Sequence, residues 1–448
     1  MKKIHWVYSN EIRQWAEKDG KLCYDTVPNL SLDGREYQSM YGFGACFNEL
    51  GYIALSLIEP QAQKKIMQDL FGTGESNCNF NFCRLPIGAN DYAVDWYSLD
   101  EKKDDFSLEN FSIERDRKYL IPYIHLAQFF NPDLKFFASP WSPPTWMKNP
   151  PVYNWGKLIM TEENLKAYAN YFLKYIGAYK AEGIRIIQIH VQNEPVANQK
   201  FPSCMWTGDE LCVFIRDYLG PVFKENKLDT EIWLGTINAP GCDYKRMIFD
   251  KWATEDYDYF ANLVLSDEKA REYIKGVSYQ WGGKIAIQRT FESWWPEIRL
   301  MQSENECGFG DNTWEYAKYN WTMLKHYIAN GAESYIYWNM ILEPFGYNTW
   351  GDPQNSMITI DPNAGTIRYN PDYYLMKHFS ANVQRGAICL GLKGPMAGDT
   401  LVFRNPDKSY TVECLNPFNE IKSLFLSLED SIFQFDLEPR SFNSMNIY

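Results

Sequence analysis

The chain has 448 residues, of which 45 % are hydrophobic and 23 % charged, and its formal net charge is −13. A negative balance of this size, with Lys and Arg scattered along the chain, argues against nucleic acid and against an anionic membrane surface as partners. The length suits one large barrel domain with an accessory part, or two to three ordinary domains.

The first 38 residues are expected to form strands and turns that pair with a distant part of the chain. Residues 4–8 alternate in polarity and Asp33-Gly34 marks a turn, but this stretch is too short to fold alone. The start lacks the apolar segment and cleavage site of a secretory signal, and nowhere do about 20 apolar residues run together. We therefore expect a cytoplasmic protein without stable membrane association.

From about residue 41 an apolar strand, a polar and aromatic loop and an amphipathic helix recur. The predicted strands cover residues 41–47, 79–86, 134–139, 184–192, 231–237, 274–281, 298–303 and 334–338. The predicted helices cover residues 59–71, 113–130, 161–182, 209–226, 312–330 and 371–380. Eight strands that alternate with helices predict a (β/α)₈ TIM barrel over residues 39–384 rather than an open sheet.

After about residue 384 the helical period disappears and short alternating segments follow. They cover residues 387–392, 400–404, 410–415, 423–428 and 431–437, with turn residues between them. Residues 385–448 are therefore expected to form an accessory β-sandwich, completed by the strands of residues 1–38. The barrel is then an insertion between two pieces of one sandwich.

Two of the predicted barrel strands end in an acid. The strand of residues 184–192 runs into Asn193, Glu194 and Pro195, and the strand of residues 298–303 runs into Glu304. Breaking an acetal bond requires two carboxyl groups, one that protonates the leaving oxygen and one that stabilises or attacks the anomeric carbon. Because a barrel gathers its strand ends at one rim, these two acids are candidates for that pair.

Other residue types point away from cofactor chemistry. The ten Cys include no Cys-x-x-Cys pair and are expected to be reduced thiols, mostly buried. The five His show no His-x-x-x-His spacing, so no metal site and no other cofactor is expected. Aromatic residues make up 17 % of the chain; flat rings suit the apolar faces of sugars, although most large aromatics serve packing.

The strand ends carry further motifs in a fixed order. They are Gly42-Phe-Gly, Arg84-Leu-Pro, Ala138-Ser-Pro-Trp-Ser-Pro-Pro-Thr-Trp-Met-Lys148, Gln192-Asn-Glu-Pro195, Gln302-Ser-Glu304 and Tyr337-Trp-Asn339. Together they resemble glycoside hydrolase family 30, which includes the glucosylceramidases, and the resemblance extends over nearly the whole chain.

The resemblance implies roles for individual residues. Glu194 matches the acid/base, Glu304 the nucleophile, Asn193 the amide that holds the sugar 2-hydroxyl, and Arg84 an arginine that braces the nucleophile. The residues that match positions shaping the glycone subsite are Asp91, Trp141, Trp338 and Asn348.

The sixth strand departs from the pattern of relatives in the same clan. They end this strand in His-x-Tyr, with the Tyr donating to the nucleophile, whereas this chain has Ser278-Tyr-Gln-Trp281. Tyr279 and Trp281 are counted among the candidate substrate-binding residues. Which of Tyr279, Gln280 and Trp281 contacts the nucleophile is left open at this point.

The function expected from these residues is that of a retaining exo-β-glycosidase acting on small β-glucosides by double displacement. Retention predicts that the two carboxyl groups lie about 5 to 5.5 Å apart. The alternatives are a β-xylosidase, a β-fucosidase or a β-1,6-glucanase of the same family. A catalytically inactive carbohydrate-binding barrel is an alternative from another class, and a phosphate-using barrel enzyme is disfavoured because no phosphate loop follows a strand.

Overall fold

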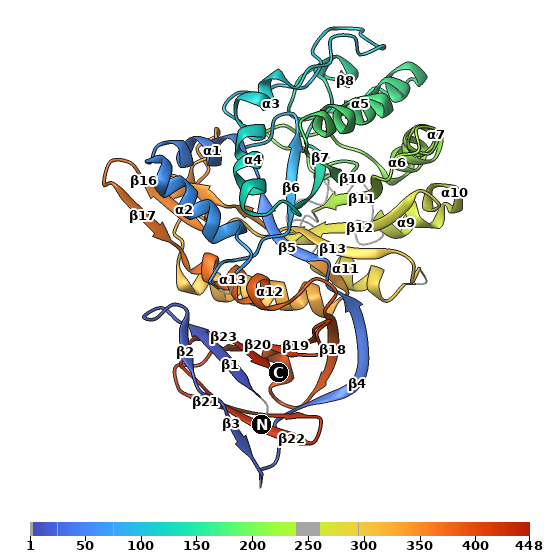
Figure 1. The fold of residues 1–448 in the computed structure, drawn as a ribbon. Coiled ribbons are helices and arrows are strands. Elements are labelled where there is room, and N and C mark those ends of the chain that lie inside the picture. Colours follow the sequence, from blue (N-terminus) through green and yellow to red (C-terminus); the bar gives the residue numbers. More distant parts are fainter. Residues whose placement is uncertain (1–2, 25, 75, 239–259, 294) are drawn as a thin grey trace, which may run out of the picture.

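The barrel of the computed structural model is closed by eight parallel strands (Figure 1), and the structure describes residues 3–24, 26–74, 76–238, 260–293 and 295–448. The strands, in the order in which they pair around the barrel, are β10 (Ile186–His190), β11 (Glu231–Ile237), β12 (Ile274–Gln280), β13 (Arg299–Glu304), β14 (Ala332–Asn339), β5 (Gly42–Cys46), β6 (Phe82–Ile87) and β7 (Lys135–Pro140). All eight predicted barrel strands are thereby confirmed, with small differences at their ends.

Helices surround this barrel. Those described are α1 (Glu49–Ser56), α2 (Pro60–Phe71), α3 (Glu114–Lys118), α4 (Leu120–Phe130), α5 (Glu162–Ala181), α6 (Gly208–Phe214), α7 (Gly220–Glu225), α9 (Phe260–Ser266), α10 (Glu268–Arg271), α11 (Lys284–Phe291), α12 (Trp314–Ala329) and α13 (Pro371–Asn382). Two predicted helices are not continuous. That of residues 113–130 breaks at Tyr119, whose φ is −130°, and that of residues 209–226 contains a π-helical turn, Ile215–Leu219.

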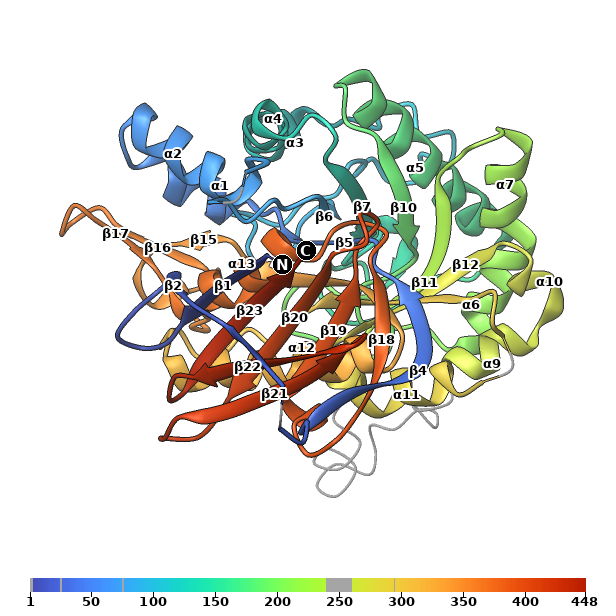
Figure 2. The same ribbon diagram turned by 60° about the horizontal axis from the view of Figure 1, so that its bottom comes forward.

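The accessory part is one curled sheet of ten strands (Figure 2). Its pairing order is β2 (Ala16–Lys18), β1 (Ile4–Ser9), β23 (Ser441–Ile447), β20 (Tyr410–Asn416), β19 (Thr400–Arg404), β18 (Ile388–Lys393), β4 (Leu30–Ser39), β21 (Lys422–Leu428), β22 (Ser431–Leu437) and β3 (Lys21–Cys23). The sheet folds over its own apolar core, in which Trp6 meets Phe435 edge to face at 5.4 Å. The N- and C-terminal strands thus form one accessory unit, as expected, although β23 was not predicted.

The accessory sheet packs against α12 and α13 of the barrel (Figures 1 and 2). His378 of α13 lies between the hydroxyls of Ser444 on β23 and Ser9 on β1, at 2.6 and 2.9 Å. The ring of Trp314 on α12 stacks on Phe442 at 4.6 Å. Polar and aromatic contacts from both ends of the chain therefore attach the sheet to the barrel.

Short elements that the sequence did not predict cover part of the barrel rim. A three-stranded sheet consists of β15 (Ile341–Leu342), β16 (Ile358–Asp361) and β17 (Thr366–Tyr369). A second pair consists of β8 (Lys148–Asn149) and β9 (Lys157–Leu158). Short 3₁₀ turns lie at Thr145–Met147, Trp281–Gly283, Pro344–Gly346 and Ala397–Asp399.

The lower part of the barrel interior is filled by apolar side chains. These fully buried residues form one cluster: Phe82, Phe137, Trp233, Met301 and Ile336. The barrel is therefore a packed core rather than a pore, and its functional groups lie above this cluster, toward the carboxyl ends of the strands. Within the described ranges, no helix has the length and apolar character needed to cross a membrane.

Candidate active site

The two predicted acids lie at the carboxyl ends of β10 and β13, and therefore on the same rim of the barrel. Glu194 follows β10, is 7 % exposed, and adopts a φ of 49°, a region that non-glycine residues seldom occupy. Its backbone N–H donates to the carbonyl of Thr236 at 2.8 Å, which anchors this turn to the neighbouring strand. Glu304 is the last residue of β13 and is 8 % exposed.

Arg84, on β6, connects the two halves of the site. Its Nη1 forms an ion pair with Oε2 of Glu304, and its side chain is fully buried. Its Nη2 donates to Oδ1 of Asn193 at 2.6 Å and to the hydroxyls of Ser139 and Thr236 at 2.9 and 3.1 Å. A guanidinium only donates, so each of these partners must present an acceptor to it.

Two tryptophans enclose this arginine. Trp141, after β7, and Trp338, on β14, lie with ring centres 5.6 Å apart and planes inclined by 30°. The guanidinium carbon of Arg84 lies 4.4 Å from the ring centre of Trp141 and 5.7 Å from that of Trp338. Tyr92 packs edge-on against Trp338. The predicted aromatic residues of the subsite are therefore gathered beside the charged network.

Asp91 and Asn348 meet at the same rim. The pKa of Asp91 is raised to about 7: burial is the main cause, the charge of Glu194 adds to the rise, and a hydrogen bond from Asn348 opposes it. Asn348 is fixed in turn, because its Oδ1 accepts from the backbone N–H groups of Trp350 and Asp352 at 2.9 and 3.0 Å. The structure thus brings Asp91 within electrostatic reach of the acid at position 194.

The environment of Glu304 combines opposing effects. Its pKa is raised to about 8: burial is the main cause, the charges of Glu194 and Asp91 add to the rise, and Arg84 opposes it. Repulsion from Glu194 vanishes whenever that residue is protonated, and the ion pair with Arg84 then favours the carboxylate of Glu304. Of the three carboxyl groups, Glu304 forms the ion pair with Arg84, so the site favours a single negative charge at Glu304 over several.

The three residues left open on the sixth strand are now distinguished. Tyr279 lies outside the barrel lumen, where its hydroxyl shares a hydrogen bond with Thr290 of α11 at 2.6 Å, so its expected place among the substrate-binding residues is wrong. Gln280 points inward, since successive strand residues alternate between faces, and its Nε2 donates to Asn193 at 2.7 Å and to Thr236 at 2.9 Å. Trp281 is half-buried and starts a 3₁₀ turn.

Two polar residues at the end of the fifth strand were missed. Thr236 is the fully buried hydroxyl already described. Asn238 donates from Nδ2 to Oε1 of Glu194 at 2.9 Å, while its own Oδ1 accepts from the backbone N–H of Gly282 at 3.0 Å. The run Gly235-Thr-Ile-Asn238 lacks an acid, but polar residues at the end of an apolar barrel strand were signal enough to find it.

Over residues 40–383 the chain matches the glycosyl hydrolase family 30 TIM-barrel domain. The chain belongs to this family. Lysosomal acid glucosylceramidase of Mus musculus is 27 % identical over 432 residues, which cover 90 % of this chain and 80 % of that protein. Endo-1,6-beta-D-glucanase of Neurospora crassa is 27 % identical over 394 residues, covering 84 % and 75 %.

Solved structures agree with the fold. An endo-beta1,6-glucanase superimposes with a TM-score of 0.86 at 24 % identity, covering 99 % of this chain and 98 % of that one. SrfJ from Salmonella typhimurium also reaches 0.86 at 24 %, covering 100 % and 99 %. The predicted family and barrel are confirmed, and the chain is a glycoside hydrolase.

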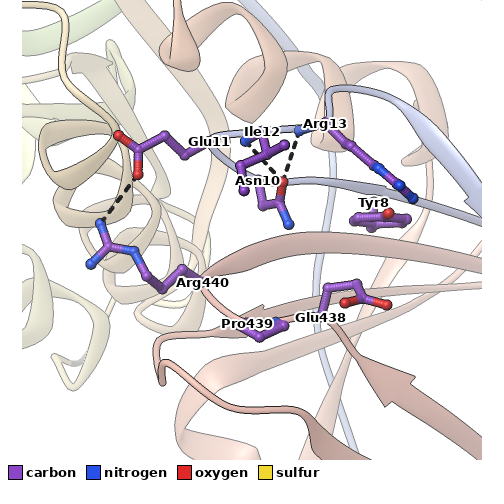
Figure 3. Close-up of a pocket in the computed structure, with 8 residues that line it drawn as sticks. All are labelled: Tyr8, Asn10, Glu11, Ile12, Arg13, Glu438, Pro439 and Arg440. Atoms are coloured by element: carbon purple, nitrogen blue, oxygen red, sulfur yellow. Dashed lines mark hydrogen bonds and ion pairs between the residues drawn. The ribbon is translucent and has the colours of Figure 1, made fainter.

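A pocket of about 480 Å³ in this family 30 chain lies away from the catalytic rim (Figure 3). It is formed by the loop after β1 and the turn before β23, both in the accessory sheet. Glu11 lies 3.9 Å from Arg440, and Glu438 pairs with Lys18 at 2.5 Å. This pocket lies in the accessory sheet and not at the carboxyl ends of the barrel strands, where the active site of such a barrel is expected.

The nine cysteines within the described ranges are free thiols, and most of them are buried. Burial raises the pKa of both Cys46 and Cys307, which lie near Glu304, and this favours the neutral thiol in each case. The described residues contain no group of three or more His, Cys, Asp or Glu that could hold a metal ion.

Proposed function

We propose that this chain hydrolyses β-glucosides with retention of configuration, through a covalent glycosyl-enzyme on Glu304. The observation that carries the proposal is the arginine network: Arg84 bonds both Glu304 and Asn193, the residue next to Glu194. One buried cation thus holds the nucleophile and the residue next to the acid/base in fixed positions relative to each other. Retention requires the two carboxyl groups to lie about 5 to 5.5 Å apart.

The first step forms the intermediate. A carboxylate oxygen of Glu304 bonds to the anomeric carbon while the bond from that carbon to the leaving oxygen breaks, and Glu194 gives its proton to that oxygen. The ion pair with Arg84 opposes the burial that raises the pKa of Glu304, and so favours the carboxylate that this attack needs. Asn238 donates to Oε1 of Glu194 and so restricts the orientation of the acid.

The second step releases the sugar. Glu304 is now a neutral ester, and Glu194, which has lost its proton, accepts one from water as the water oxygen bonds to the anomeric carbon. The ester bond breaks and Glu304 leaves as a carboxylate, again paired with Arg84. Two inversions at the same carbon give net retention.

A gluco-configured, exo-acting site is proposed for the glycone. Asp91 can accept from sugar hydroxyls, and Trp141 and Trp338 offer apolar ring faces beside it. The names of the mouse and Neurospora relatives both denote enzymes for glucose-containing substrates. The second candidate, cleavage within β-1,6-glucan, is supported by the Neurospora relative, whose identity to this chain is the same as that of the mouse enzyme.

The deciding experiment is labelling with 2-deoxy-2-fluoro-β-glucosyl fluoride, followed by intact mass and peptide mapping. The fluorine slows both steps, while the activated leaving group allows the intermediate to accumulate. We expect one adduct, on Glu304, and none in Glu304→Gln. An adduct on another residue contradicts the assignment, and folded protein that reacts with neither the gluco, xylo nor fuco reagent supports the inactive binding barrel.

Product analysis then separates the two modes of action. With β-1,6-linked gluco-oligosaccharides of increasing length, each turnover of an exo-acting enzyme releases glucose and an oligosaccharide that is one unit shorter. An endo-acting enzyme first releases pairs of shorter oligosaccharides with little glucose, and that result would favour the glucanase candidate.

A further inference from the structure

The side-chain oxygen of Asn193 receives hydrogen bonds from three neighbouring strands. Nη2 of Arg84 on β6 donates at 2.6 Å, Nε2 of Gln280 on β12 at 2.7 Å, and the hydroxyl of Thr236 on β11 at 3.0 Å. Gln280 also donates to the oxygen of Thr236 at 2.9 Å, which leaves the threonine proton for Asn193. An amide oxygen has two lone pairs, so three donors exceed what a buried Asn needs to satisfy its hydrogen-bonding capacity.

This arrangement determines which way the amide of Asn193 faces. Arg84 has no acceptor, so the atom of Asn193 that it touches must be Oδ1 and not Nδ2. Gln280 must then present its Nε2 to the same oxygen, because Oε1 of Gln280 in that place would face Oδ1 of Asn193, and two acceptors cannot form a hydrogen bond. Consistent with this, Oε1 of Gln280 is buried without a hydrogen-bond partner among the described residues.

The opposite end of the amide is thereby directed away from the network. No hydrogen bond within the described ranges uses Nδ2 of Asn193, and the residue is 3 % exposed at the rim beside Glu194. Because the amide cannot flip, its N–H₂ group always faces the rim, where it can donate to a sugar hydroxyl.

We propose that Gln280 and Thr236 are positioning residues that hold the Asn193 amide with its N–H₂ toward the substrate 2-hydroxyl. This rests on the proposed function, since it assumes a glycone at the catalytic rim. The sixth strand then acts through Asn193, because the hydrogen bonds of the Gln280 side chain go to Asn193 and Thr236 rather than to the nucleophile. Without these two donors, Arg84 alone opposes rotation of the amide.

The proposal has a specific energetic consequence. Hydrogen bonds to the 2-hydroxyl strengthen as the oxocarbenium-like transition state forms. A loosely held amide therefore weakens the transition state more than substrate binding, so kcat falls while KM changes little. A substrate without a 2-hydroxyl does not form this hydrogen bond, so its turnover should not change when the amide rotates.

The test compares 4-nitrophenyl β-glucoside with its 2-deoxy analogue in Gln280→Met, which keeps the length of the side chain and removes its donor. We expect kcat/KM on the glucoside to fall roughly 10- to 100-fold, the range that follows from one lost buried hydrogen bond. On the 2-deoxy substrate the variant should match the wild type within about threefold. Equal losses on the two substrates overturn the proposal.

Two further variants keep the test informative if Gln280→Met folds poorly. Thr236→Val removes the second donor at nearly constant shape, and it should show the same selective loss. Gln188→Met is the matched control: Gln188 is a buried lumen residue of β10 that bonds Glu231 and His190, so its loss should not alter the ratio between the substrates. Absence of wild-type turnover on the glucoside refutes the proposed function, whereas wild-type turnover with equal losses in the variants refutes only this inference.

Discussion

Two layers of side chains fill the barrel, and they differ completely in character although they lie on the same strands. The lower layer contains Phe82, Phe137 and Ile336. Two residues further along each strand, on the same face, the upper layer has Arg84, Ser139 and Trp338. The lower layer is apolar and closely packed, while the upper one is a network of charged, hydroxyl and amide groups beside tryptophan rings.

The comparison shows how stability and chemistry are divided within one core. Apolar burial in the lower layer stabilises the fold. The upper layer buries carboxyl groups whose pKa values are raised by desolvation, which opposes stability at neutral pH. His190 lies at the boundary: its ring stacks on Trp233 and lies tilted against Phe137, its Nδ1 bonds Ser278 at 2.7 Å, and burial lowers its pKa well below the usual value.

The largest expected effect is the loss of activity in Glu304→Gln, a substitution in the upper layer. Loss of the nucleophile is expected to lower kcat roughly 10⁴-fold or more, because no covalent intermediate can form. The folded structure should persist, since Gln keeps the shape of the side chain. Steady-state kinetics with an aryl β-glucoside and thermal unfolding measure the two effects, and retained turnover would remove Glu304 from its role.

Glu194→Ala should show a loss that depends on the leaving group. An alkyl β-glucoside needs its leaving oxygen protonated, so its kcat/KM should fall roughly 10²- to 10⁴-fold. A dinitrophenyl β-glucoside leaves without protonation, and its kcat/KM should fall by no more than about tenfold. Equal losses on both substrates would assign the acid/base role elsewhere.

Phe137→Ala, a substitution in the lower layer, should lower the stability of the fold and leave kcat nearly unchanged. Truncating this fully buried ring removes apolar contacts and leaves a cavity, at a cost of about 3 to 5 kcal/mol in the free energy of unfolding. The catalytic groups above are untouched, so kcat per folded molecule should stay within a few-fold of the wild type. Denaturant unfolding and active-site titration check this, and a selective loss of kcat would show that the two layers are coupled.

The smallest expected effect is a change in the free energy of unfolding with pH. It distinguishes the two layers without any measurement of activity. The pKa of Glu304 is raised from 4.5 to about 8 in the folded protein. Its contribution to stability is therefore complete below pH 4.5 and is lost as the pH rises toward 8. Relative to wild type, Glu304→Gln should become more stable between pH 5 and 8, by about 3.5 kcal/mol. The deficit of Phe137→Ala should be the same at both pH values.

Much of the architecture could be predicted from the sequence because apolar strands and helix signals recur with regular spacing. The acids at positions 194 and 304 were found for the same reason, since each follows an apolar run directly. Gln280 could not be separated from Tyr279, because a shift of one residue reverses the face of a strand and both side chains suit either face. The structure resolves this through the partners of each residue.

Other features were missed because their stabilisation comes from tertiary contacts. Strand β23 contains Ser441, Asn443, Ser444 and Asn446, which hide its alternation, yet these polar groups are buried against neighbouring strands and α13. The rim sheet of β15, β16 and β17 is too short to stand out from loop. The sandwich was expected as two sheets, and the parallel pairing of β21 with β4 joins it into one.

The pairing of the first strand with the last also constrains how the protein is made. Trp6 on β1 bonds Asn443 on β23, a residue 437 positions later in the chain. At about 5 to 20 residues per second, translation separates these two partners by roughly 20 to 90 seconds. During that interval the whole barrel emerges while β1, β3 and β4 still lack their C-terminal partners, which are β23, β22, and β18 with β21. The nascent chain must therefore carry exposed strand edges through most of its synthesis, so slower elongation should lengthen the time in which aggregation competes with folding.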